Sequence, residues 1–274
     1  MNYRHVFHAG NHADVLKHVV LLELLAALAR KPAPYFVLDT HAGSGRYALA
    51  ADSEAASGIL RLAMQETPML ARYRDAVAAH NTDSRMSNYP GSPLLIAGAL
   101  RDDDRLACCE LQPEEAATLK ALLHHDPRVG VHRRDGYDAL GALLPPPEKR
   151  GLVLIDPPYE AQDAEYPRIL DALKQGLARW PQGIFALWYP IKRRRTLLPF
   201  FRRVAALPAK SALLVELLVQ PDDSPLRLNG SGMLILNPPW QLDRALPPLL
   251  GALRTALAPD TGSTRLEWLK PEAA

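Results

Sequence analysis

Leu152-Val153-Leu154-Ile155-Asp156-Pro157-Pro158-Tyr159 is the stretch that decides the fold. Its four apolar residues are typical of a fully buried strand, and the two prolines end that strand because they fix φ and remove two backbone donors. The chain then leaves the sheet as a stiff loop with unpaired carbonyl groups. A carboxylate, carbonyl acceptors and an aromatic ring therefore converge at one strand end, which suits a planar group that bears an amine. A Pro-Pro turn with an N-capping Asp is the simpler interpretation, and the residues upstream argue against it.

Composition limits the class of protein. The 274 residues are enough for one large domain or a domain with an insertion, and the 48% of apolar residues excludes general disorder. The net charge is only +2, which does not indicate nucleic-acid binding, and any such binding must come from local patches. Cys108 and Cys109 are neighbours in a predicted strand and face opposite ways, which argues against a disulfide or a metal pair. With no signal peptide and no apolar run of membrane length, we expect a protein of the reducing cytoplasm with no membrane partner.

Strand and helix patterns alternate along the chain, which predicts a parallel sheet with helices on both faces. The last two of seven predicted strands lie close enough in sequence to pair antiparallel. The predicted strands are residues 35–39, 106–110, 129–132, 152–155, 184–189, 213–219 and 232–236. More than sixty residues separate the first two strands, far beyond a usual crossover. Helical patterning in residues 53–89, for example 71–80, predicts an inserted helical subdomain within a single domain of residues 1–274.

The Asp156 tetrad (residues 156–159) resembles the signature of the amino-methyltransferases. These enzymes use S-adenosylmethionine to methylate the exocyclic amine of adenine or, in relatives, cytosine or glutamine. Seven strands in this order are similar to the mainly parallel sheet of Rossmann-like class I S-adenosylmethionine-dependent methyltransferases. Ligands of such sheets bind at the carboxyl ends of the strands, near the point where strand order reverses.

Residues that suit this cofactor follow the predicted strands in order. Gly43 and Gly45 let the backbone turn tightly near the aminocarboxypropyl group, where Asp39 or His41 would contact its polar atoms. Glu110 ends the second strand, where a ribose diol would donate two hydrogen bonds; a solvated carboxylate is about equally expected at that position.

Asp135-Gly136 follows the third strand and would lie beside the adenine, with Gly136 admitting the ring edge. A dinucleotide site is less favoured, because the full Gly-x-Gly-x-x-Gly is absent and residue 48 is Ala48. A second tetrad-like stretch, Asn237-Pro238-Pro239-Trp240, follows the seventh strand rather than the fourth. We interpret it as a strand-terminating loop that packs Trp240.

Four histidines near the amino terminus invite a metal interpretation. His8 and His12 are four residues apart, but the residues between them are poor helix formers and no Glu follows His8 as the zincin pattern requires. Methyl transfer from a sulfonium needs no Lewis acid, so we expect no metal. Instead, Asn11 or Asp14 is predicted to cap a helix that begins near residue 13 and whose far end projects Lys17 and His18 towards the cofactor.

Residues 3–5, 7–18, 39–47 and 89–93, together with the Asp156 tetrad, resemble one family over essentially the whole chain. It is the RlmJ family of bacterial 23S ribosomal RNA adenine-N6 methyltransferases. The resemblance implies methyl transfer to the N6 amine of a specific adenine in 23S ribosomal RNA, with Asp156 as the catalytic residue. It also implies contact of Tyr3 with the RNA, and contacts to S-adenosylmethionine from His18, His41, Ser92, Glu110, Asp135, Gly136 and Asp156.

The residues of the tetrad have distinct expected roles. Asp156 and the carbonyl of Pro157 would accept the two N–H bonds of the adenine amine, which increases the lone-pair density on nitrogen. Tyr159 would stack on a base that has swung out of its helix. Asp156 is also the expected proton acceptor once the amine becomes cationic.

Two groups of basic residues are candidates for phosphate contacts. Residues 192–195 are Lys-Arg-Arg-Arg at the start of a predicted helix that also carries Arg202 and Arg203. A solvated helical face and a phosphate-binding surface are about equally favoured for this run. Arg72, Arg74 and Arg85 in the predicted insertion form a weaker candidate.

Three other functions are alternatives to the methylation of ribosomal RNA. A DNA adenine methyltransferase shares the tetrad but normally carries a target-recognition region, and nothing beyond the short insertion could fill that role. A protein-glutamine methyltransferase more often has Asn at the position of Asp156. A ribosome-assembly factor with a degenerate fold is disfavoured by the intact residues at the strand ends.

Overall fold

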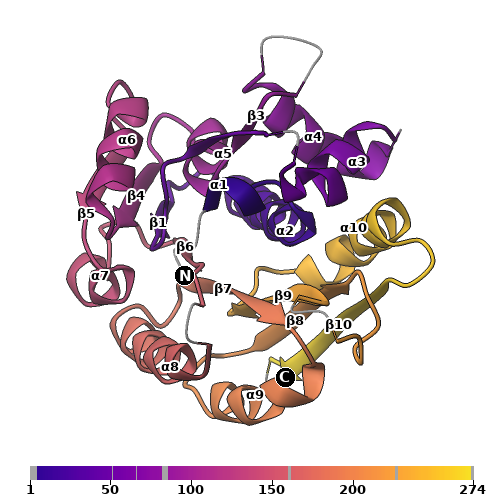
Figure 1. Cartoon of the computed structure of the whole chain (residues 1–274). Coiled ribbons are helices and arrows are strands. Elements are labelled where there is room, and N and C mark those ends of the chain that lie inside the picture. The colour runs from indigo at the N-terminus through magenta and orange to yellow at the C-terminus, as the bar shows by residue number, and fades with distance from the viewer. Residues whose placement is uncertain are drawn as a thin grey trace.

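A mixed sheet forms the centre of the protein (Figure 1). The computed structural model describes residues 5–50, 52–65, 67–81, 86–159, 162–225 and 228–272. The sheet has eight strands in the order β10-β8-β9-β7-β6-β1-β4-β5. Their bounds are β1 Phe36–Asp39, β4 Arg105–Glu110, β5 Val129–Arg133, β6 Gly151–Ile155, β7 Ile184–Ile191, β8 Ala212–Leu218, β9 Gly230–Leu236 and β10 Ser263–Lys270.

The seven predicted strands are present, and the sheet has an eighth strand that was not predicted. Strands β5, β4, β1, β6 and β7 run parallel, whereas β9 pairs antiparallel with both β7 and β8. The extra strand, β10, pairs antiparallel with β8 at the edge of the sheet. Each of its residues is at least partly exposed, and it carries Arg265, Glu267 and Lys270. An edge strand of this kind has no continuous apolar run to reveal it in the sequence.

Helices cover both faces of the sheet. One face is covered by α2 His12–Ala29, α3 Ile59–Ala63, α4 Ala71–Ala78, α5 Ser92–Ala99, α6 Pro113–Leu123 and α10 Leu242–Leu257. The other is covered by α7 Gly136–Leu143, α8 Gln162–Arg179 and α9 Leu198–Ala205. Cys108 packs into the first core and Cys109 into the second, which confirms that these free cysteines face opposite ways. None of the helices in the described part of the chain is long and apolar enough to cross a membrane.

Helix α2 is buried along most of its length, and its start fixes part of the site. The side chain of Asn11 accepts hydrogen bonds from the backbone N–H groups of Ala13 and Asp14 at 2.9 and 3.0 Å. This confirms the predicted cap and satisfies two of the donors that a helix start leaves open. Lys17 and His18 lie in the second turn, however, so the prediction that the far end of the helix carries them is wrong.

The stretch between β1 and β4 is partly helical. The predicted helix at residues 71–80 is observed as α4, and it is joined by α3 and by 3-10 turns at Glu54–Ser57 and Pro68–Leu70. A two-stranded antiparallel sheet, not anticipated from the sequence, pairs β2 Arg46–Ala48 with β3 Asn88–Pro90. The boundaries of an inserted subdomain at residues 53 and 89 stay a prediction.

The second tetrad-like stretch ends β9 and serves as a structural turn. Asn237 has a positive φ of 53°, and its side chain donates to the carbonyl groups of Pro181 and Gly183 and accepts from the N–H of Lys210. Trp240 is 77% exposed, so the expected packing of this side chain is wrong. The loop is held by its asparagine and not by its tryptophan.

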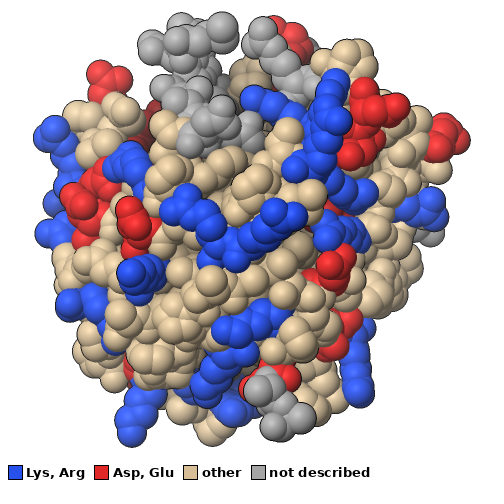
Figure 2. Space-filling view, turned by 90° about the horizontal axis from the view of Figure 1, so that it is seen from below, with Lys and Arg blue, Asp and Glu red and all other residues tan. Residues whose placement is uncertain are grey.

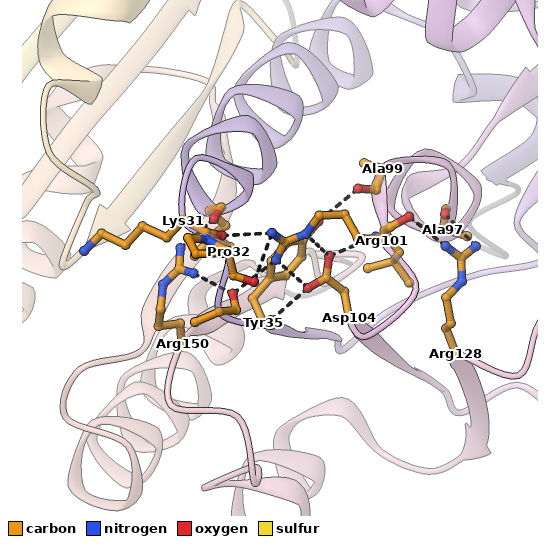
Figure 3. A network of polar contacts seen from close by, with 12 residues as sticks. Lys31, Pro32, Tyr35, Ala97, Ala99, Arg101, Asp104, Arg128 and Arg150 are labelled. Atoms are coloured by element: carbon orange, nitrogen blue, oxygen red, sulfur yellow. Dashed lines mark hydrogen bonds and ion pairs between the residues drawn. The ribbon is translucent and has the colours of Figure 1, made fainter.

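A polar network closes the amino-terminal end of β1, opposite the candidate site (Figure 3). Asp104 is fully buried and accepts hydrogen bonds from the N–H of Tyr35 and from Nε and Nη2 of Arg101. The same guanidinium donates to the carbonyl of Lys31, and that of Arg150 to the carbonyl of Ala33. The network therefore ties the loop after α2 to the chain before β4 and to the chain before β6.

We expect Asp104→Ala to lower the free energy of unfolding by about 1.5–3 kcal/mol, the range for hydrogen bonds to a charged group. Burial would raise the pKa of Asp104, but the hydrogen bonds from Arg101 and Tyr35 outweigh it and hold that pKa below its usual range. Its stabilising contribution is therefore present above the unfolded pKa, about 3.9, and is lost as pH falls. Urea unfolding of both proteins at pH 7 and near pH 3 tests this, since the difference between them should shrink in acid.

Candidate active site

Asp156 lies at the carboxyl end of β6 and is held by a lysine from α2. Nζ of Lys17 donates to Oδ2 of Asp156 at 2.5 Å and to Oδ1 of Asp14 at 2.7 Å. Oδ2 of Asp14 in turn accepts the backbone N–H of Gly10 at 2.9 Å. The ammonium group is thus buried between two carboxylates from segments far apart in the sequence, and it fixes the position of Asp156.

Electrostatics keeps this lysine charged. Burial lowers the pKa of Lys17, but the carboxylates of Asp14 and Asp156 outweigh burial and raise it above its ordinary value. A buried ammonium with two hydrogen-bonded carboxylates is the arrangement expected where a charge must stay inside a protein. Lys17 is therefore a fixed positive centre beside Asp156.

A third carboxylate, Asp39, ends β1 close to this cluster. It is fully buried, and its Oδ2 accepts a hydrogen bond from Oγ of Ser92 at 2.6 Å. Burial raises its pKa to about 7; Ser92 and Lys17 act in the opposite direction, while the charge of Asp156 adds to the increase. Asp39 therefore titrates near neutral pH, and Ser92 is positioned at the site through it.

The loops after β1, β4 and β5 pack against one another. The backbone N–H of Gly43, a residue with φ of 59°, donates to Oε2 of Glu110 at 2.8 Å. A side chain at Gly136 would place its Cβ 2.1 Å from the carbonyl oxygen of Thr40, so glycine is required for this close approach. The residues predicted from three separate strand ends are thus brought to one edge of the sheet.

His41 has a defined hydrogen-bonding state. Oγ1 of Thr40 donates its proton to the carbonyl of Leu154 at 2.9 Å and lies 2.7 Å from Nδ1 of His41. Because the hydroxyl has only one proton, Nδ1 of His41 must be the donor in the second contact. Burial lowers the pKa of His41, which favours the neutral ring with Nε2 as an acceptor.

Asp135 acts as the N-cap of α7. Its Oδ1 accepts from the N–H groups of Tyr137 and Asp138, and its Oδ2 accepts from Nη2 of Arg168 at 3.2 Å. Burial would raise the pKa of Asp135, but these backbone donors and Arg168 hold it below its usual range. Asp135 is therefore a fixed anion at the end of β5.

His18 is almost completely buried. It is 1% exposed, and its Nδ1 lies 2.7 Å from the hydroxyl oxygen of Tyr89 in β3. Tyr89 comes three residues before Ser92, so the contact links α2 to the chain that carries this serine. A direct contact between His18 and a ligand stays a prediction.

The tetrad itself is anchored to the neighbouring strand. Tyr159 has a positive φ of 51°, and its hydroxyl donates to the carbonyl of Trp188 in β7 at 2.8 Å. The centroids of its ring and the Trp188 ring are 5.7 Å apart in an edge-on arrangement, and Tyr159 is half-buried. Pro157 is buried and Pro158 exposed, so the loop turns outward between them. Stacking of Tyr159 on a base stays a prediction.

His8, one of the amino-terminal histidines, pairs with a carboxylate. Nδ1 of His8 pairs with Oε2 of Glu54 at 2.8 Å, and Nδ2 of Asn11 donates to the same oxygen. Within the described ranges, no group of three or more His, Cys, Asp or Glu side chains could hold a metal ion. Tyr3, the predicted RNA contact, lies outside the described residues.

Sequence reasoning missed the partners of several of these groups. It treated Asp14 as a possible helix cap, whereas Asp14 is the second carboxylate on Lys17. It assigned no role to Thr40, whose hydroxyl orients His41, or to Trp188, whose carbonyl holds Tyr159. The Asp14–Lys17 spacing of three residues on a helix was the available signal for the first of these.

Comparison with known proteins assigns the family. The model of the family described as "Ribosomal RNA large subunit methyltransferase D, RlmJ" matches residues 32–270. The chain belongs to the RlmJ family. Proteins named ribosomal RNA large subunit methyltransferase J from Haemophilus influenzae and Escherichia coli are 40% and 38% identical to it, and each alignment covers 99% of this chain and 100% of the relative. A crystal structure of a Legionella pneumophila protein superposes with a TM-score of 0.88 at 38% identity, covering 95% of this chain and 98% of that one.

Membership of the RlmJ family confirms the predicted Rossmann-like class I methyltransferase fold, here extended by β10. Its cofactor, S-adenosylmethionine, fits the residues at this edge of the sheet. The glycine at 136 allows the loops to converge, and anionic and neutral acceptors surround them at Glu110, Asp135 and His41. The ammonium of the aminocarboxypropyl group, the ribose diol and the adenine amine of the cofactor are all hydrogen-bond donors, so this set of acceptors matches them.

Proposed function

We propose that this chain transfers a methyl group from S-adenosylmethionine to the exocyclic N6 amine of an adenine in 23S ribosomal RNA, a reaction expected in the cytoplasm. The position of Asp156 carries the proposal. It lies at the end of β6, beside β1 with its Asp39, and the buried ammonium of Lys17 holds it in place. An acceptor fixed at this point suits an amine that must be oriented for attack.

In the proposed mechanism, the main contribution of the protein is to orient the adenine amine for attack on the methyl group. Lys17 occupies Oδ2 of Asp156, and we assign the other oxygen, Oδ1, to one N–H of the adenine amine. The carbonyl of Pro157 accepts the second N–H, so the nitrogen lone pair points away from both acceptors. Bound S-adenosylmethionine supplies an electrophilic methyl group. Asp156 then takes the proton that the methylated amine loses.

Binding of the cofactor is assigned to the acceptors at the strand ends. Nε2 of His41 would accept from the cofactor's amino group, and Glu110 from its ribose hydroxyls. Asp135 would accept from its adenine amine, with Gly136 beside the ring. Ser92 and His18 would also contact the cofactor. Tyr159 stacks on the target base, and Tyr3 contacts the RNA from the amino terminus.

Methyl incorporation tests the substrate class. Purified protein is incubated with labelled S-adenosylmethionine and, in separate reactions, protein-free 23S RNA, genomic DNA and total cell protein. We expect label in the RNA, recovered as N6-methyladenine after digestion. Label in DNA or in glutamine side chains would replace the proposed substrate, and no label in any of the three would favour an assembly factor.

Glu110→Ala should weaken cofactor binding more than it slows transfer at saturating cofactor. One hydrogen bond to a charged group is worth about 1.5–3 kcal/mol, which is roughly ten- to hundredfold in affinity. Calorimetric titration with S-adenosylmethionine measures the decrease. Glu114→Ala, which removes an exposed carboxylate from the first turn of α6, is the matched control. Equal affinities for the two variants would remove Glu110 from the site.

A further inference from the structure

The basic run at residues 192–195 follows β7, at the edge of the sheet that carries the Asp156 tetrad. Ile155, the last residue of β6, is in register with Leu187 of β7, and β7 continues to Ile191. Four more residues of strand extend about 13 Å at roughly 3.3 Å per residue. Lys192 therefore starts beyond the tetrad at the same edge of the sheet, and the bond from Tyr159 to Trp188 joins the tetrad loop to β7.

One arginine of this run is directed inward and anchors it. Nε of Arg194 donates to Oε2 of Glu216 at 2.7 Å, and its backbone N–H donates to Oδ1 of Asp222 at 2.7 Å. Glu216 is fully buried in β8 and also accepts from the hydroxyl of Tyr189 at 3.0 Å. Arg194 is thus a structural residue, and it fixes the backbone from which its neighbours project.

The other three cations of the run are exposed, and so are the two arginines of α9. Helix α9 packs its apolar side into the core through Phe200, Phe201 and Val204, which leaves its basic side outward. Among the described residues, Arg194 is the member of the run with an acidic partner in an ion pair. The exposed cations are Lys192, Arg193, Arg195, Arg202 and Arg203. Figure 2 views the molecule from the side where α9 lies in Figure 1, and Lys and Arg side chains spread widely over that face.

The second candidate for phosphate contacts, the arginines of the predicted insertion, makes contacts within the protein. Arg72 pairs with Glu23 of α2, and Nη1 of Arg74 donates to the carbonyl of Gln65 at 3.1 Å. Arg85 lies outside the described residues. The two described arginines thus each serve a contact within the protein.

We propose that Lys192, Arg193, Arg195, Arg202 and Arg203 form a surface that binds the phosphates of the RNA flanking the target adenine; we call it the α9 surface. The proposal rests on the proposed function, because a base that reaches Asp156 brings its neighbouring phosphates to the edge of the sheet where residues 192–195 lie. Phosphates further along the RNA would reach Arg202 and Arg203 in the last turn of α9. When exposed cations contact phosphates, counterions condensed on the RNA are released, which supplies affinity independent of sequence. Arg194 maintains the arrangement without contacting RNA.

The test compares two charge-reversed variants. Arg195→Glu/Arg202→Glu alters the α9 surface, and Arg244→Glu/Arg254→Glu makes the same charge change on α10, on the opposite face of the sheet. Arg202 and Arg254 both lie in the last turn of their helix, and all four side chains are exposed. Melting temperatures and calorimetric affinities for S-adenosylmethionine are measured first, and we expect both to match the unaltered protein.

Single-turnover methylation is then measured against the concentration of protein-free 23S RNA and at several salt concentrations. We expect the α9 variant to need at least tenfold more RNA for half-maximal rate, with its maximal rate retained. Its affinity should also depend less on salt, by about 0.7–0.9 in the log–log slope for each phosphate that the variant no longer neutralises. The α10 variant should behave like the unaltered protein.

Two results would overturn the proposal: equal RNA dependence in the α9 variant and the unaltered protein, or equal weakening in both variants. In either case methylation of RNA by the unaltered protein would leave the proposed function standing. Failure of the unaltered protein to methylate RNA would instead contradict the proposed function itself, which separates the two.

Discussion

Replacing Asp156 with alanine is expected to abolish methyl transfer, with a decrease of about 10²–10⁴-fold or more in the single-turnover rate. The adenine amine is a poor nucleophile because its lone pair is delocalised into the ring, and removing the carboxylate takes away both its orientation and its proton acceptor. Cofactor affinity should fall but stay measurable, since Glu110, Asp135 and His41 remain. Labelled-methyl transfer and calorimetry, done on the same protein, measure the two effects separately.

Asp156→Asn is the matched control. It keeps the size of the side chain and one carbonyl acceptor, so it should retain more activity than the alanine variant while losing the proton acceptor and the full ion pair with Lys17. Near-normal methylation by Asp156→Ala would contradict the assignment of Asp156 as the catalytic residue. Loss of cofactor binding in proportion to activity would make it a cofactor ligand only.

The parallel strands and the residues at their ends were predictable because the signals are local. A buried strand shows as a short apolar run, as in residues 152–155, and parallel topology then brings the carboxyl ends of neighbouring strands to one edge. Glu110 and Asp135 could therefore be placed from the sequence alone. Their proximity follows from the topology and not from their spacing in the sequence.

Other features of the site and the fold depend on contacts that no local pattern contains. Lys17 and Asp156 are 139 residues apart, and only the packing of α2 beside the end of β6 brings them together. Strand β10 was not predicted because its sequence is charged and has no continuous apolar run, as is typical of a loop. Trp240 was expected to pack because large aromatic residues usually do, yet Asn237 holds that turn.

The Lys17 cluster (Asp14, Lys17 and Asp156) makes a strong prediction about stability. Lys17→Met removes the cation but leaves the carboxylates of Asp14 and Asp156, whose side chains are only 11% and 9% exposed. Removing one partner of a buried ion pair typically costs about 3–5 kcal/mol. We expect a destabilisation of this size at pH 7, together with a strong decrease in methylation, because the position of Asp156 is no longer fixed.

The pH dependence distinguishes this explanation from a simple packing defect. Without the ammonium, the two buried carboxylates favour uptake of a proton, so in the variant a carboxylate pKa in the folded state should lie above its unfolded value. The folded variant then binds more protons than the unfolded chain, and its stability relative to the unaltered protein should rise as pH falls from 7 towards 5. A second change, Asp14→Asn, removes one of the two charges and should recover part of the stability at pH 7 without restoring methylation. Urea unfolding of the single and double variants across this pH range measures both effects, and a pH-independent destabilisation that Asp14→Asn does not relieve would show that Lys17 acts through packing alone.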